Sequence, residues 1–125
     1  MVEKVILIID DDEKLSKMLG FLFTAKGFKV EYAKSGGDAF EILNRMRPNV
    51  IILDIMMPGM DGFEVCKKFK EKEEIKDIPV IMLSALPSAQ NREKSLALGA
   101  YSYFEKPFKS MDLVAKTIEA LESSQ

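Results

Sequence analysis

Apolar runs alternate along the sequence with stretches in which apolar residues recur at helical spacing. Three runs are almost continuously apolar, as in strands that are buried on both faces of a sheet. These runs cover residues 4–9, 50–53 and 80–83. Residues 28–32 instead alternate apolar with charged side chains, which predicts a strand at the edge of the sheet. A fifth strand is predicted over residues 100–104.

Each predicted strand is followed by an amphipathic helix. These helices are expected after the acidic run at 10–13, between Ser35 and Pro48, over 62–72, over 88–98 and from Met111 to Leu121. Met18 and Met111 fall on the apolar faces of the first and last helices. The helix over 88–98 has few apolar residues, chiefly Leu96 and Leu98, so we expect it to be the least firmly packed.

The strand–helix order, repeated five times, restricts the fold. Alternating units require right-handed crossovers and a parallel sheet with helices on both faces. If the strand at 28–32 forms the edge, the strand order is 2-1-3-4-5. The predicted fold is therefore α/β, a flavodoxin-like (βα)5 three-layer sandwich, and its 125 residues fit one domain over 1–125.

Two acidic signals that lie far apart in the sequence converge in this fold. Asp10 and Asp11 follow the first strand and Asp54 follows the third, at the switch point where ligands of such sheets bind. Three carboxylates this close repel one another and call for a cation. With oxygen ligands only, Mg²⁺ fits best, with Mn²⁺ as an alternative. Ser84 and Lys106 follow the fourth and fifth strands and complete a set of groups suited to phosphoryl transfer.

Composition excludes several other kinds of protein. The chain has no histidine and a single cysteine, Cys66, which excludes Ser-His-Asp and Cys-His catalysis, an internal disulfide and a zinc cluster. The net charge is −2 and the cationic residues are spread along the chain, so the sequence does not indicate a basic surface for binding nucleic acid. No apolar run is long enough to span a membrane. The expected location is a reducing cytoplasm.

Four motifs in order resemble the receiver domain of two-component response regulators. They are ILIIDDDE at 6–13, DIMMPGMDG at 54–62, IPVIMLSA at 78–85 and GAYSYFEKPF at 99–108. The resemblance covers nearly the whole chain and points to a single-domain receiver of the chemotaxis or relay type. It implies that a sensor histidine kinase or a histidine phosphotransfer protein passes a phosphoryl group to Asp54.

The resemblance also implies roles for the residues around Asp54. Asp11 and Asp54 would bind Mg²⁺ directly, Asp10 through water, and Met56 through its backbone carbonyl. Ser84 matches the hydroxyl that contacts the phosphoryl group. Its movement would be followed by Tyr103, which matches the aromatic switch residue.

Two further positions complete the match. Lys106 corresponds to the lysine that pairs with the acceptor or the phosphoryl group. Pro107 corresponds to a proline that follows this lysine through a cis bond, which X–Pro bonds adopt at low cost. Asp12 is interpreted as a helix cap or an outer charge, although Asp11 could also cap the first helix.

The expected output is a change of protein binding on the face formed by the fourth helix, the fifth strand and the fifth helix. The downstream protein target stays unknown, a phosphorylation-dependent homodimer stays open, and no contact with nucleic acid or membrane is expected. A stand-alone receiver and a piece of a longer regulator are both open. The domain is expected to catalyse only its own phosphorylation and a slow dephosphorylation, because Met56 and Leu86 cannot orient an attacking water.

Three other functions fit the sequence less well. An FMN-binding protein shares the strand order, but the acids at 10–12 would repel its phosphate. A Mg²⁺-dependent phosphatase would need an acid where Met56 stands. A degenerate receiver that acts only as a binding surface is disfavoured because every site position is filled.

Overall fold

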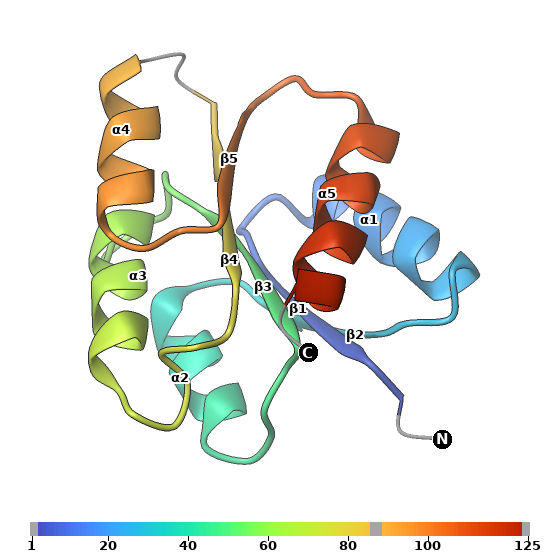
Figure 1. Ribbon diagram of the computed structural model, residues 1–125, viewed down its shortest axis with the longest axis horizontal. Helices are drawn as coiled ribbons and strands as arrows, with labels where there is room; N and C mark the ends of the chain where they lie inside the picture. The colour runs from blue at the N-terminus through green and yellow to red at the C-terminus, as the bar shows by residue number, and fades with distance from the viewer. Residues whose placement is uncertain (1–2, 86–88, 124–125) are drawn as a thin grey trace.

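The computed structural model describes residues 3–85 and 89–123, in which five strands alternate with five helices (Figure 1). The strands are β1 (Val5–Ile9), β2 (Lys29–Ala33), β3 (Val50–Asp54), β4 (Val80–Ser84) and β5 (Ser102–Glu105). The helices are α1 (Glu13–Ala25), α2 (Gly36–Leu43), α3 (Gly62–Glu71), α4 (Ala89–Ala97) and α5 (Ser110–Ser123).

The strands form one parallel sheet in the predicted order β2-β1-β3-β4-β5. Helices α2, α3 and α4 cover one face of the sheet and α1 and α5 the other, which is the expected flavodoxin-like sandwich (Figure 1). In the centre, Ile9 of β1 pairs with Leu53 of β3. Asp10 and Asp54 directly follow these two residues, so both acids emerge at the same edge of the sheet.

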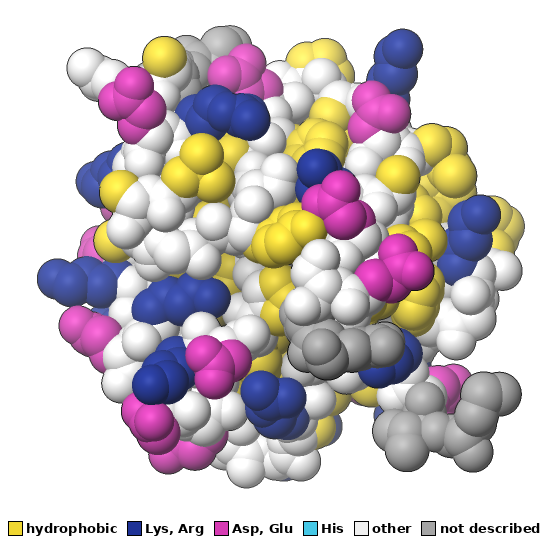
Figure 2. Space-filling model, viewed as in Figure 1, with side chains coloured by type: hydrophobic (Ala, Val, Ile, Leu, Met, Phe, Trp, Pro, Cys, Tyr) yellow, Lys and Arg dark blue, Asp and Glu magenta, His cyan; other side chains and the backbone are white. Residues whose placement is uncertain are grey.

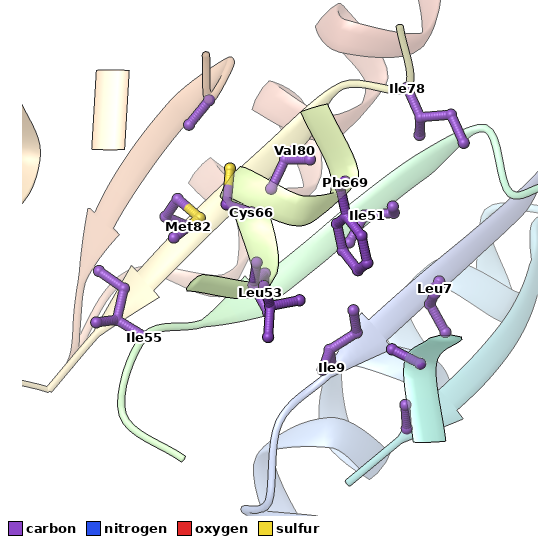
Figure 3. Packing of buried hydrophobic residues seen from close by; sticks show 14 of the residues in the cluster. Leu7, Ile9, Ile51, Leu53, Ile55, Cys66, Phe69, Ile78, Val80 and Met82 are labelled. Atoms are coloured by element: carbon purple, nitrogen blue, oxygen red, sulfur yellow. The ribbon is translucent and has the colours of Figure 1, made fainter. Parts of the chain in front are cut away.

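The sheet separates two hydrophobic clusters. Because successive strand side chains point to opposite faces, Leu7 and Ile9 join the cluster on the α2–α3 side, where Phe69 of α3 lies (Figure 3). Ile6 and Ile8 join the cluster on the side of α1 and α5. Burial on both faces explains why the central strands are almost purely apolar.

Two aspartates begin helices. The Oδ1 atom of Asp12 accepts a hydrogen bond from Leu15 N at 3.2 Å, so Asp12 rather than Asp11 caps α1. Asp61 caps α3 in the same way, accepting from Glu64 N at 3.0 Å. Gly99 follows α4 with a φ of 98°, a conformation that side chains with a Cβ rarely adopt.

Three residues that the sequence pattern assigned to inner helix faces are exposed. The exposed fractions are 44% for Met18, 45% for Leu96 and 53% for Met111. Helical spacing identifies residues that share a face, but the buried stripe is narrower than that face. In α4 the buried side chain is Ser95, next to Leu96, and Met111 lies in the first turn of α5.

The predicted start of the fourth helix at Ser88 lies outside the described residues. No helix within 3–85 and 89–123 is both long and apolar enough to cross a membrane. On the face shown in Figure 2, acidic and basic side chains are interspersed, without a large field of one sign. This mixture matches the net charge of −2 and the even spread of cations along the chain.

Candidate phosphorylation and metal site

Three carboxylates meet at the carboxyl ends of β1 and β3. Asp10, Asp11 and Asp54 each offer an oxygen within 4.8 Å of the others. Asp10 and Asp54 are buried, and Asp11 is exposed. The acids that the sequence separates by more than forty positions are therefore brought together by the parallel pairing of β1 with β3.

The ammonium group of Lys106 balances part of this charge. Lys106, which follows β5, donates a hydrogen bond from Nζ to Asp10 Oδ2 at 3.0 Å. The same Nζ lies 3.4 Å from Asp54 Oδ1. Burial disfavours the charge of Lys106, but its hydrogen bond to Asp10 and the attraction of both aspartates raise its pKa overall. Lys106 is thus charged, and its closer partner is Asp10.

The carboxyl group of Asp54 is held in an unfavourable environment. Burial, followed by repulsion from Asp10, raises its pKa to about 6, although Lys106 acts in the opposite direction. Its Oδ1 atom is buried and accepts no hydrogen bond among the described residues, and the Lys106 ammonium lies 3.4 Å from it as an ion pair. A buried oxygen without a partner costs free energy unless something else binds it.

This observation fits a divalent cation. The cluster supplies only carboxylate oxygens, which are the ligands that Mg²⁺ prefers, and one of those oxygens lacks a partner. Met56 follows Asp54 by two residues in the loop that leads to α3, and its side chain is 48% exposed. The residues present therefore fit a metal ion of this type.

Glycine lets the loop after Asp54 turn back onto the strand end. Gly62, the first residue of α3, donates a hydrogen bond from its amide to Ile55 O at 2.8 Å. A Cβ at this position would lie 2.4 Å from Asp54 O and 2.6 Å from Ile55 Cα, which are backbone atoms. The sequence pattern predicted a helix start at Gly62 but carries no signal for this close approach.

Ser84 lies at the end of β4 and is fully buried. Its backbone carbonyl accepts from Lys106 N at 2.7 Å, which joins the ends of β4 and β5. The Nδ2 atom of Asn91, in α4, donates to Ser84 Oγ at 3.4 Å. Asn91 was not among the predicted site residues, since an asparagine in an exposed helix carries no distinct sequence signal.

Tyr103 lies in β5, and Pro107 lies in the loop that follows this strand. The Tyr103 side chain is buried, with 4% exposed, and its hydroxyl has no hydrogen-bond partner within the described part of the chain. The Lys106–Pro107 peptide bond is cis, at the position where the resemblance implied one. Leu86, expected to influence the lifetime of a phosphoryl group, lies outside the described residues.

Comparison with known proteins agrees with this geometry. The family model described as response regulator receiver domain matches residues 6–118. The chain belongs to this family. It is a receiver domain of the two-component type, and its acidic pocket suits phosphorylation and metal binding.

Solved structures of other receiver domains superimpose closely on this chain. A putative response regulator from Chloroflexus aurantiacus is 30% identical, with a TM-score of 0.91, over 97% of this chain and 99% of the other. The receiver domain of a signal transduction histidine kinase from Syntrophus aciditrophicus is 31% identical, with a TM-score of 0.88, over 96% and 91%. A CheY-like receiver protein from Methanospirillum hungatei is 29% identical, with a TM-score of 0.90, over 98% and 97%.

Proposed function

We propose that this receiver domain accepts a phosphoryl group on Asp54 and thereby changes its binding to a protein partner. The observation that carries the proposal is the buried Asp54 Oδ1, which lacks a hydrogen-bond partner in the described part of the chain and lies 3.4 Å from the Lys106 ammonium. An anionic oxygen held in this way is a nucleophile beside a fixed positive charge. The carboxylates of Asp10 and Asp11 would then help to bind a cation.

Asp10, Asp11 and Asp54, together with the Met56 carbonyl, would hold the ion, and Mg²⁺ is the ion that suits them best. When bound, the ion would neutralise charge on the carboxylates and on the phosphoryl oxygens. Asp10 has a further role, because its Oδ2 atom holds the Lys106 ammonium in place next to Asp54.

The donor in this proposal is a phosphohistidine of a sensor histidine kinase or a histidine phosphotransfer protein. An Asp54 carboxylate oxygen attacks phosphorus, a P–O bond forms, and the P–N bond breaks with its electron pair passing to the imidazole. Lys106 pairs with the new charge and Ser84 hydrogen-bonds a phosphoryl oxygen. The chain turns over no separate substrate.

Output is proposed to run through Ser84 and Tyr103 to the face formed by α4, β5 and α5. Tyr103 is already buried, and its hydroxyl has no hydrogen-bond partner among residues 3–85 and 89–123, which makes this buried position less favourable. Phosphorylation would bias the balance between two packings of this face. The exposed, apolar side chain of Met56 supplies no group to orient an attacking water, so slow loss of the phosphoryl group is expected.

Intact-mass measurement after incubation with Mg²⁺ and acetyl phosphate tests the proposal. We expect the wild type to gain the mass of one phosphoryl group and to lose it slowly. Asp54→Asn should gain nothing, while Asp61→Asn, which changes a nearby acid of the same loop, should be labelled like the wild type. Labelling of Asp54→Asn to the wild-type level would contradict the assignment, and continuous release of phosphate from sugar phosphates would favour a phosphatase.

A further inference from the structure

Helix α4 buries little of its surface in the described part of the chain. Within the described residues of this helix, Ser95 is the only buried side chain, and Leu96 is 45% exposed. Apolar burial, which holds the other helices, is therefore nearly absent from α4. Its position depends on polar contacts, which are short-ranged and can be exchanged for other partners.

These polar contacts form a continuous series that starts at the proposed phosphorylation site. Asn91 Nδ2 donates to Ser84 Oγ at 3.4 Å, a long hydrogen bond that is easily broken. The carbonyl of Asn91 accepts from Ser95 Oγ at 2.7 Å. The carbonyl of Ser95 in turn accepts from Ala100 N at 3.0 Å, just before β5. The series thus links the end of β4 to the segment that leads into β5.

A second contact holds α4 from the side of α3. The Nζ atom of Lys94 lies over the ring of Phe63, 4.3 Å from its centroid, in a cation–π contact. Lys94 is three residues after Asn91, so both side chains project from neighbouring positions on the helix. Phe63 also lines the apolar groove of about 430 Å³ next to Met56, in the loop that follows Asp54.

We propose that Asn91 is a positioning residue that holds α4 in its resting orientation through the Ser84 hydroxyl. This inference rests on the proposed function. When the Ser84 hydroxyl moves to donate its proton to a phosphoryl oxygen, its Oγ atom is drawn away from Asn91 Nδ2, and this long contact is lost. Helix α4 then turns away, and Lys94 leaves the ring of Phe63. Phosphorylation of Asp54 in this way changes the surface that α4 presents to a partner.

The resting protein, without Mg²⁺ or phosphoryl donor, provides the first test. The ε-methylene protons of Lys94 should resonate upfield in the wild type because they lie near the face of the Phe63 ring. In Asn91→Ala they should shift towards the value of a free lysine. The matched control Gln90→Ala changes the exposed residue next to Asn91 and should leave them unchanged.

A double-mutant cycle separates positioning through Ser84 from a local effect on the helix. In the Ser84→Ala background, Asn91→Ala should shift the Lys94 resonance much less than it does in the wild-type background. A wild-type resonance in Asn91→Ala would overturn the inference. So would a full additional shift in the Ser84→Ala background, since Asn91 would then act without Ser84.

Binding of beryllofluoride with Mg²⁺, as a phosphoryl mimic, gives the second test. Loss of one hydrogen bond that favours the resting state should make Asn91→Ala bind beryllofluoride about fivefold more tightly than the wild type. Gln90→Ala should bind like the wild type. Equal affinity of Asn91→Ala and wild type would overturn the coupling, whereas no binding by the wild type would overturn the proposed function as well.

Discussion

At the scale of single residues, Asp54 combines properties that ordinary surface aspartates lack. It is buried, it faces a second buried carboxylate, and its Oδ1 atom lacks a hydrogen-bond partner among the described residues. Burial and the nearby Asp10 together raise its pKa to about 6, so the metal-free carboxyl group titrates close to neutral pH. Binding of a cation must therefore compete with a proton.

We expect the affinity for Mg²⁺ to fall as the pH is lowered through about 6, because the ion needs the deprotonated form of Asp54. Isothermal titration calorimetry at pH values on both sides of this point measures the effect. The control Asp11→Asn should bind more weakly at every pH and still lose affinity as the pH falls, with a slightly lower midpoint because the Asp11 charge also raises the pKa of Asp54. An affinity that is constant across this range would contradict the raised pKa.

At the scale of elements, the positions of the strand ends depend on how closely α3 approaches β3. Asp61 caps the helix and Gly62 lies against the backbone of Asp54 and Ile55. Backbone atoms cannot rotate away from an added methyl group as a flexible side chain can. The end of β3, and with it the direction of Asp54, is therefore fixed by the absence of a side chain at Gly62.

Gly62→Ala should lower the free energy of unfolding by about 2 kcal/mol or more, because its Cβ would clash with backbone atoms at 2.4 and 2.6 Å. Gly37→Ala is the matched control: its Cβ would meet only Ser35 Oγ at 3.8 Å, and alanine favours the helix by about 0.5–1 kcal/mol. Urea denaturation of both variants measures these effects. Equal stability of the two variants would refute the role given to Gly62.

The elements also differ in how far sequence alone could predict them. The β-branched runs of β1, β3 and β4 specified a buried parallel sheet, and the alternating run identified the edge strand correctly. Met18 and Met111 were placed wrongly, because periodicity does not tell how wide the covered stripe of a helix is. Asn91 escaped notice, since its contact with Ser84 depends on where α4 crosses the end of β4.

At the scale of the whole molecule, the fold brings together charges that weaken it. The parallel sheet places Asp10 and Asp54 at one edge, and the topology predicted from sequence was sufficient to expect this meeting. The burial of Asp10 and Asp54 could not be predicted, because it depends on side-chain packing. For the same reason, the sequence could not show that Lys106 lies closer to Asp10 than to Asp54. The burial of these carboxylates lowers the free energy of unfolding of the domain.

The contribution of Asp54 to stability changes with pH in a direction that its raised pKa determines. The pKa of Asp54 lies above the value of 3.8 for a free aspartate, so the folded state holds the proton more tightly than the unfolded state. Stability contributed by this group is present at low pH and is lost as the pH rises from about 3.8 to about 6. At neutral pH, the buried charge opposes folding unless a cation is bound.

Asp54→Asn should therefore raise the free energy of unfolding at neutral pH without Mg²⁺, by about 1–3 kcal/mol. The gain should shrink as the pH falls below about 6, where the wild-type carboxyl group is protonated. Mg²⁺ should stabilise the wild type and much less the variant, because it binds only the folded site. Thermal unfolding with and without Mg²⁺ measures both effects, and Glu41→Gln, an exposed acid on α2, controls for net charge. If Asp54→Asn were no more stable than Glu41→Gln in the metal-free protein, the buried charge would not be the source of the strain, and the domain would hold Asp54 without the cost that its burial implies.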